Sequence, residues 1–196
     1  MAKVNLRKVI LIVAIANLSY FFIEFFFGLR IHSVSLFADS IDFLEDSSIN
    51  FLIFFALGWS LLARSRLGMV LAGIIFVPSL ATLWEVWQQI TFHKPPQPIS
   101  LSLVGLGALI VNYSCALLLE EFRHHHGSIV HAAFLSARND AAANISIILA
   151  GFITLIYPSI WPDVIVGLAI AALNANAARE VYQKALEERK LSKGIA

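Results

Sequence analysis

Cysteine is nearly absent from this chain, since Cys115 is the only one among 196 residues. A single thiol forms neither an intrachain disulfide nor a thiolate cage for a metal. Charge is also scarce, because 14% of the residues are Asp, Glu, Lys or Arg, against about 25% in ordinary soluble domains. With a formal net charge of +1 and no large basic cluster, the chain lacks the means to neutralise many phosphates. Nucleic acid is therefore excluded as a partner.

Hydrophobic residues are abundant instead, at 59% of the chain, against about 45–50% in soluble domains. A helix needs about 20 apolar residues to cross a bilayer. Apolar runs separated by short polar breaks predict six such helices, at residues 6–29, 33–62, 67–92, 100–119, 128–157 and 161–186. The predicted fold is an all-α membrane protein, with a six-helix transmembrane domain at 1–187 and a short charged cytoplasmic tail at 188–196.

Basic residues are distributed unequally between the two sides of this arrangement. Six spans place both termini on one side, and the side richer in Lys and Arg is the cytoplasmic one. The side of the termini holds eleven basic residues, namely Lys3, Arg7, Lys8, Arg64, Arg66, Arg123, Arg179, Lys184, Arg189, Lys190 and Lys193. The other side holds only Arg30 and Lys94. Both termini are therefore predicted to be cytoplasmic.

Four carboxylates lie in the second predicted span, a costly arrangement. A charged group at mid-bilayer costs at least about 2.5–3.5 kcal/mol on insertion scales, so intramembrane acids indicate a functional site. At 100° per residue, three of these acids share one helix face, while Glu45 is predicted to face elsewhere. The shared face holds Asp39, Asp42, Asp46 and Asn50. Asp42 and Asp46 are one turn apart, close enough to hold one ion together.

The fifth predicted span repeats this pattern, since Ser136, Asp140 and Asn144 recur every four residues. Two helices that offer carboxylate, hydroxyl and amide oxygens at matching depth can enclose one divalent cation. Carboxylates must lose their protons to bind a metal, so metal and protons compete for such a site. We therefore predict that Asp42, Asp46 and Asp140 are metal ligands.

Other roles for these polar residues remain open at this stage. Acids can pair with a buried cation or act as protonated contacts between helices. Arg138 lies within the fifth predicted span and is predicted to pair with Glu45 or Asp39. One arginine does not satisfy all of the acids. For the amides and the hydroxyl on the two faces, hydrogen bonding between helices is an equal alternative to ligation.

The residues described so far resemble the cation diffusion facilitator family. The segment 33–46 is similar to the family's Leu-x-Ala-Asp sequence followed by His/Asp-x-x-x-Asp. The run Asp140-Ala-Ala-Ala-Asn144 resembles the fifth-span half of the family's site, and 161–167 resembles the opening of its sixth span. Glu24 and Gly28 resemble the end of its first span. The match touches four of the six predicted spans.

The resemblance implies a secondary transporter rather than an enzyme, a homodimer in a membrane that we expect to be the bacterial inner (plasma) membrane. It exports divalent cations in exchange for protons, by alternating access around a site shared by the second and fifth spans. The implied metal ligands are Asp42, Asp46, Asp140, Ser136 and Asn144, with Asp39, Asn50 and His131 as secondary candidates. No tightly bound cofactor is expected. The expected cargo is Zn²⁺, with Cd²⁺, Co²⁺ and Mn²⁺ as further substrates.

The chain departs from the family's pattern in two respects. Ser136 and Asp42 stand where zinc-transporting members commonly carry histidine. Imidazole suits zinc and oxygen donors suit manganese, but zinc also accepts carboxylates, so the Zn/Cd/Co class remains the expectation. The sequence also ends at Ala196 without the ferredoxin-like cytoplasmic domain that usually follows the sixth span. Dimerisation and regulation are then expected to rest on the membrane helices.

Histidines lie mainly outside the predicted membrane site. His124, His125 and His126 occupy the loop between the fourth and fifth spans, where they are either a solvated loop or a weak site that captures metal. His131 lies one turn before Ser136 and is a candidate ligand or proton relay near the cytoplasmic side.

Two other functional classes compete with transport. A metal sensor or scaffold without transport is one, since the family's sensing domain is absent from the sequence. An intramembrane aspartyl protease is the other, because two membrane acids on different helices can share a proton and activate water. The Gly-x-Gly-Asp context of such proteases is absent.

Overall fold

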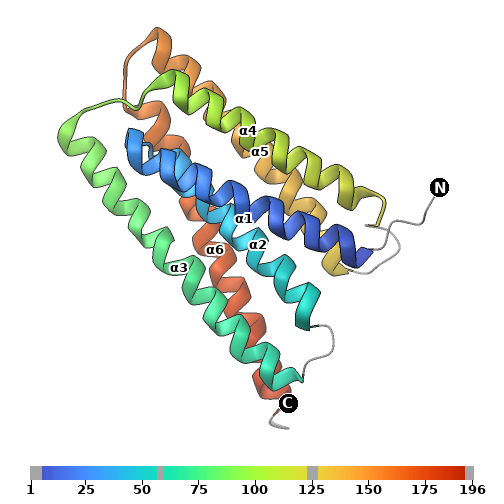
Figure 1. The fold of residues 1–196 in the computed structure, drawn as a ribbon. Helices are drawn as coiled ribbons and strands as arrows, with labels where there is room; N and C mark the ends of the chain where they lie inside the picture. Colours follow the sequence, from blue (N-terminus) through green and yellow to red (C-terminus); the bar gives the residue numbers. More distant parts are fainter. Residues whose placement is uncertain (1–5, 57–59, 123–127, 193–196) are drawn as a thin grey trace.

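The computed structural model describes residues 6–56, 60–122 and 128–192, and this part of the chain forms six helices (Figure 1). They are α1 (Leu6–Ile31), α2 (Val34–Ala56), α3 (Leu61–Phe92), α4 (Pro98–Glu120), α5 (Ser128–Ile156) and α6 (Trp161–Ser192). By length and composition, α1, α4, the segment Ser136–Ile156 of α5, and α6 can each cross a membrane. α2 is not among these, since it includes the four carboxylates of the second predicted span. The prediction of an all-helical protein is confirmed.

The boundary between the second and third helices differs from the prediction. The sequence predicts a break at 63–66, but these residues are helical, and α2 already ends at Ala56. Ser60 is the N-cap of α3, where its hydroxyl accepts a hydrogen bond from the backbone N–H of Ala63 at 3.4 Å. A serine in this position satisfies an N–H group that the first helical turn leaves free. The arginines near residue 65 therefore lie in the first turns of α3 rather than in a loop.

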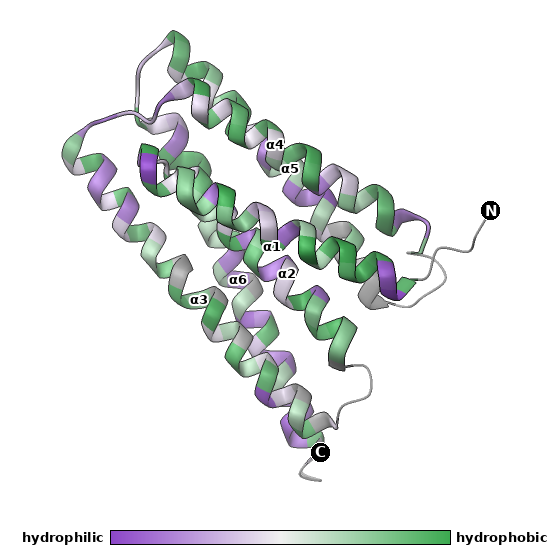
Figure 2. Ribbon diagram, viewed as in Figure 1, coloured by the Kyte–Doolittle hydropathy of each residue, from purple (hydrophilic) through white to green (hydrophobic). Residues whose placement is uncertain are grey.

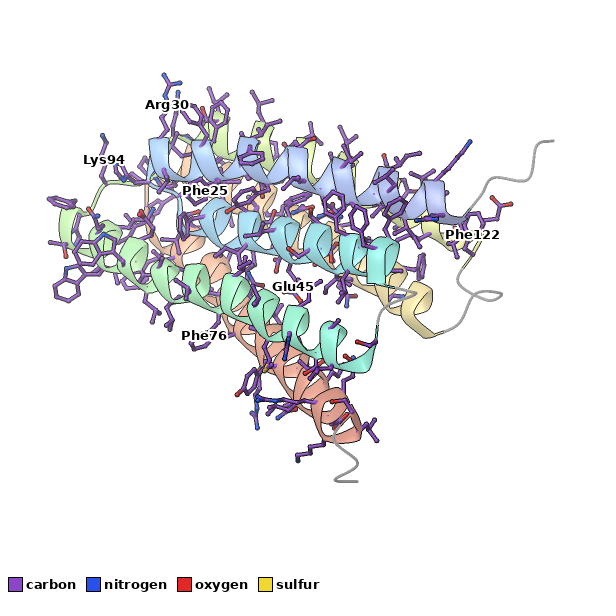
Figure 3. All side chains as sticks on the ribbon, turned by 60° about the horizontal axis from the view of Figure 1, so that its bottom comes forward. Phe25, Arg30, Glu45, Phe76, Lys94 and Phe122 are labelled. Carbon is purple, nitrogen blue, oxygen red and sulfur yellow. The ribbon has the colours of Figure 1, made fainter. Side chains whose placement is uncertain are left out.

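Three helix pairs make up the bundle, namely α1 with α2, α4 with α5, and α3 with α6 (Figure 1). α2 contacts all five of the other helices, so the helix that carries the acids lies at the centre. The two helices of each pair are antiparallel, whereas α2 and α6 run in the same direction. The Ser65 hydroxyl donates to a backbone carbonyl near the end of α6 at 2.7 Å, and the Arg7 guanidinium lies 4.6 Å from the centroid of the Phe54 ring near the end of α2. Figure 3 shows Arg30 and Lys94 together at one end of the bundle.

Asp163, at the start of α6, holds the N-terminal end of α2. One carboxylate oxygen accepts hydrogen bonds from the hydroxyls of Ser33 (2.7 Å) and Ser35 (2.5 Å) and from the Ser35 N–H (3.2 Å). The other accepts from the Val34 N–H and from the Gln89 side chain, at 2.7 and 2.9 Å. A carboxylate at a helix N-terminus caps free N–H groups and interacts favourably with the helix dipole. Here the capping carboxylate comes from α6, which is far from α2 in the sequence. Gln89 connects α3 to this junction of α2 and α6.

Two glycines allow the backbones at this junction to approach closely. A Cβ atom on Gly167 of α6 would lie 2.5 Å from Val34 Cγ1 and 2.6 Å from the Val34 carbonyl carbon. A Cβ atom on Gly28 of α1 would lie 2.9 Å from the Phe37 nitrogen. The N-terminal half of α2 and the residue before it, from Ser33 to Ile41, are buried throughout. This segment is therefore enclosed by α1 and α6 at backbone distance.

Apolar side chains dominate both the interior and the exterior of the described helices. Figure 2 shows mostly hydrophobic residues along α1 and α4, whereas the C-terminal half of α6 carries many polar ones. Leu36, Val104 and Ile147 belong to a buried cluster that joins α2, α4 and α5. Many large apolar side chains are exposed, as Phe22 and Leu103 are at 61% and 63%. A bundle that is apolar on its outer surface suits surrounding lipid.

The prediction for Arg138 is wrong. Its side chain is exposed, and within the described residues it takes part in no salt bridge, with Glu45, Asp39 or any other acid. The preceding residue, Ala137, is buried, so the next position on the helix turns away from α2. A long side chain in this position extends along the apolar surface and directs its charge toward a wetter region. Arg138 therefore does not pair with the acids of α2.

Candidate functional site

Three of the four acids of α2 open onto a cavity of about 210 Å³ between α2, α5 and α6. Polar groups from all three helices line it. The lining residues are Asp42, Glu45, Asp46, Ser136, Asn139, Asp140, Leu173 and Asn174. The sequence-predicted ligands Asp42, Asp46, Ser136 and Asp140 are therefore brought to one cavity.

Asp46 and Asp140 form the closest link between the two predicted halves of the site. The Ser136 hydroxyl donates to Asp46 Oδ1 at 2.9 Å and lies 3.5 Å from Asp140 Oδ2. The Asp46 and Asp140 carboxyl groups are direct neighbours. Ser136 and Asp140 are one helical turn apart on α5, which explains why both side chains face the same carboxylate of α2. Oxygen atoms from α2 and α5 thus converge at one point.

Glu45 also lines the cavity, so the prediction that it faces elsewhere is wrong. Figure 3 shows its side chain on the side of α2 that is turned toward α3 and α6. The charges of Asp46 and Glu180 act on it, which places Glu45 between the centre of the site and the middle of α6. α6 packs beside the acidic face of α2 and extends the cavity as far as Glu45. Both Asp42 and Glu45 therefore contribute carboxylates to it.

Asn144, a predicted ligand, does not line the cavity. It is fully buried, donates from Nδ2 to Asp39 Oδ2 at 2.6 Å, and accepts at Oδ1 from Asn112 Nδ2 at 3.1 Å. Both ends of its amide are therefore in use, and they join α2, α5 and α4. Asp39 likewise faces α5 and α1 rather than the cavity, with its second oxygen Oδ1 free of hydrogen-bond partners within the described residues. These residues form a polar link between helices behind the cavity.

Glu24 lies beside Asp39 and extends this link to α1. Its side chain is 0% exposed, and the two carboxyl groups are neighbours. Neither Glu24 oxygen has a hydrogen-bond partner within the part of the chain that the structure describes. The sequence resemblance marks Glu24 but gives it no role. Its isolation as an acid in an otherwise apolar helix is the signal that indicates a buried polar contact.

The remaining sequence candidates lie away from the cavity or outside the described structure. Asn50 is buried and donates from Nδ2 to the Asp46 carbonyl at 2.8 Å, one turn earlier on the same helix. It therefore contacts the backbone of a site residue and does not line the cavity. His131 lies within α5, but its side chain is outside the described part of the structure. The three histidines at 124–126 lie outside the described residues altogether.

A larger cavity of about 360 Å³ lies between α3 and α6, but its lining differs in kind. It is formed mostly by apolar and small residues, and Arg179 is its charged member. A guanidinium repels cations and offers no lone pair to a metal. Of these two cavities, the one between α2, α5 and α6 has the chemistry of a cation site.

The donor atoms of this cavity are oxygens from carboxylates, a hydroxyl and amides. Within the described residues, no group of three or more His, Cys, Asp or Glu side chains lies close enough together to hold a metal ion. In this conformation, the described acids therefore do not gather into one compact group, and a hydroxyl and amide groups lie among them on the cavity wall. Oxygen donors of this kind bind hard and borderline divalent cations.

Comparison with known families decides the class of the protein. The model of the cation efflux transmembrane domain matches residues 10–188, nearly the whole chain. The chain belongs to the cation efflux family. The resemblance seen in the sequence is thereby confirmed, together with a multi-pass helical membrane bundle. A comparison with curated proteins found no significant match.

Membership in the cation efflux family gives the acidic cavity a context. The family consists of transporters of divalent metal cations and is not a class of enzymes, so this chain is a cation efflux transporter. The matched region contains all six helices from the first turns of α1 into the end of α6. α2 is thus part of the transmembrane domain, although its four carboxylates keep it from being recognised as a membrane span by composition alone.

Proposed function

We propose that this cation efflux protein exports divalent transition metals of the Zn²⁺, Cd²⁺ and Co²⁺ class in exchange for protons, with Mn²⁺ as a further substrate. The observation that carries the proposal is the cavity between α2, α5 and α6, where Ser136 links Asp46 and Asp140. Zinc and its relatives accept carboxylate oxygens, and the neutral oxygens nearby add donors that manganese also accepts. The cargo is a substrate that passes through, and no resident cofactor is proposed.

Exchange for protons follows from the chemistry of the donors. Carboxylates bind a metal only after they have lost their protons, so arrival of the metal at Asp46 and Asp140 releases protons and departure of the metal lets them return. A site that alternately faces the two sides of a membrane converts this competition into antiport. Asp42 and Glu45 increase the number of carboxylates on the cavity wall that protons and metal compete for.

We also propose that both termini are cytoplasmic, that the membrane is a bacterial inner membrane, and that the protein is a homodimer. Orientation is supported by the position of Arg30 and Lys94 at one end of the bundle (Figure 3) and by the basic residues at the start of α3 and the end of α6. Dimerisation is supported by family membership and by the broad apolar surface of the helices.

The proposal is tested by uptake into liposomes. Purified protein is reconstituted into vesicles loaded with a metal-sensitive dye, and Zn²⁺, Cd²⁺, Co²⁺ and Mn²⁺ are added with and without an opposing proton gradient. We expect uptake of at least the first three, faster with the gradient, and its loss in the variants Asp46→Asn and Asp140→Asn. Glu187→Gln, an exposed acid near the end of α6, serves as the matched control and should transport normally. Transport retained in both aspartate variants would refute the site, and uptake that ignores the gradient would refute antiport.

A further inference from the structure

One wall of the cavity comes from α6, which the sequence motifs do not connect with metal binding. Asn174 lies on this wall, near the middle of α6, and its side chain is 1% exposed. It faces Asp42, Asp46 and Asp140 across a cavity of about 210 Å³. A polar amide in this position either fills a structural need or takes part in binding.

The orientation of the Asn174 amide is fixed by its neighbour on α2. Nδ2 donates to the Ala38 carbonyl oxygen at 2.9 Å. Because a carbonyl oxygen only accepts hydrogen bonds, the opposite orientation of the amide would bring two acceptors together. The amide oxygen Oδ1 must therefore point away from Ala38. It is buried and has no hydrogen-bond partner within the described residues.

A buried amide oxygen without a partner is unfavourable, and native structures rarely keep one without a use. The donor set of the cavity indicates one such use. Asp46 and Asp140 are neighbours, but no three acids, histidines or cysteines of the described residues gather closely enough to hold a metal. A cation in the cavity needs further oxygens, and Asn174 Oδ1 is held ready by the bond that its nitrogen makes.

We propose that Asn174 is a metal ligand, so that the transport site is formed by three helices, with α6 supplying a neutral oxygen that determines specificity. This inference rests on the proposed function, since it assumes that the cavity binds the transported metal. Amide oxygens suit hard cations such as Mn²⁺ better than the softer Cd²⁺. Asn174 therefore raises the affinity of the site for Mn²⁺ relative to Cd²⁺.

The choice of variants separates ligation from packing. Asn174→Leu has a similar volume and removes both the amide oxygen and the amide nitrogen. Asn174→Ala is smaller and serves if the leucine variant does not yield folded protein. Asn176→Leu is the matched control, because Asn176 lies two residues further along the same helix and is exposed.

Binding of Mn²⁺ and Cd²⁺ is measured by calorimetry on the purified full chain, alongside thermal melting without metal. We expect Asn174→Leu to weaken Mn²⁺ binding by about tenfold or more, the range found when groups around metal sites are removed, and to weaken Cd²⁺ binding less. Asn176→Leu should bind both metals like the wild type. A purely structural role predicts a lower melting temperature with unchanged affinities in the folded protein, and that result would overturn the proposal.

Asp46→Asn keeps this test separate from the test of the transport site. If the wild type binds metal and Asp46→Asn does not, the cavity is the metal site, and the Asn174 variants then decide the role of α6. Equal loss of both metals, or no loss, in Asn174→Leu and Asn174→Ala overturns the assignment of specificity to Asn174 while the transport site stands. If Asp46→Asn binds metal as the wild type does, the proposed site itself has failed.

Discussion

Removal of the Asp163 carboxylate should destabilise the N-terminal end of α2, the helix that carries the acids. The carboxylate accepts five hydrogen bonds, from the backbone N–H groups of Val34 and Ser35, two serine hydroxyls and the Gln89 amide. In Asp163→Ala the hydroxyls can rotate toward other acceptors, and Gln89 keeps its bond to the His32 carbonyl at 2.9 Å. The two backbone N–H groups have no such alternative. They belong to the first turn of α2 and are buried.

The expected loss follows from these two groups. A buried donor that loses its partner costs about 1–3 kcal/mol, so Asp163→Ala should lower the free energy of unfolding by about 2–6 kcal/mol. For a protein of this size, a change of 1 kcal/mol shifts the melting temperature by about 2–4 °C, which gives a decrease of roughly 4–24 °C. Asp163→Asn keeps one accepting oxygen and should fall between the wild type and the alanine variant.

Thermal melting of the detergent-purified protein, followed by circular dichroism, measures this decrease. The matched control is Ser100→Ala, which removes a hydroxyl bonded to the Gln97 side chain at 2.9 Å at the start of α4. That pair is exposed, so its loss should change stability by no more than about 0.5 kcal/mol. If Asp163→Ala melts within a degree of the wild type, or if Asp163→Asn is no better than Asp163→Ala, the capping argument is refuted.

Two further predictions concern the site and the packing of α2. Metal affinity should fall as the pH is lowered, because protons compete with the metal for the carboxylates of Asp46 and Asp140. Calorimetric titration at several pH values measures this dependence. An affinity that does not change with pH would contradict the prediction. Gly167→Ala should lower stability by about 1–3 kcal/mol, because its Cβ would lie 2.5 Å from Val34 Cγ1. Gly73→Ala on α3 is the control, since a Cβ there meets nothing within 4 Å and should stabilise the helix by about 0.5–1 kcal/mol. Equal melting temperatures for the two glycine variants would contradict the packing argument.

The sequence predicts the two-helix part of the site because its information is periodic. Asp42 and Asp46 on α2, and Ser136 and Asp140 on α5, are spaced one turn apart, and each pair does line the same cavity. Periodicity within one helix fixes which side chains share a face. This prediction does not require knowledge of how the helices pack against one another.

The wall of the cavity that α6 forms could not be predicted from periodicity within a single helix. Helical angles place Glu45 off the acidic face, but α6 packs against that flank of α2, so Glu45 borders the cavity as well. In the sequence, Asn174 is one of two asparagines that follow an apolar run, and its relation to α2 depends on tertiary packing. The pairing predicted for Arg138 was wrong because the position of a residue along a span indicates its depth in the membrane. That depth does not determine which side of the helix faces a neighbour.

The two ends of α2 differ in a way that bears on transport. From Ser33 to Ile41, before the site, every residue is buried, and Asp163 and Gly167 hold this half against α6. Beyond the site, from Phe51 to Phe54, the residues are partly exposed, and Phe55 is exposed at 55%. The path from the cavity toward the Ser33 end is therefore closed by packed backbone. With the termini on the cytoplasmic side, as proposed, this conformation is the one closed to the outside. Opening to the outside must then separate the outer half of α2 from the helices around it, and the most costly contacts to break are the five hydrogen bonds of Asp163.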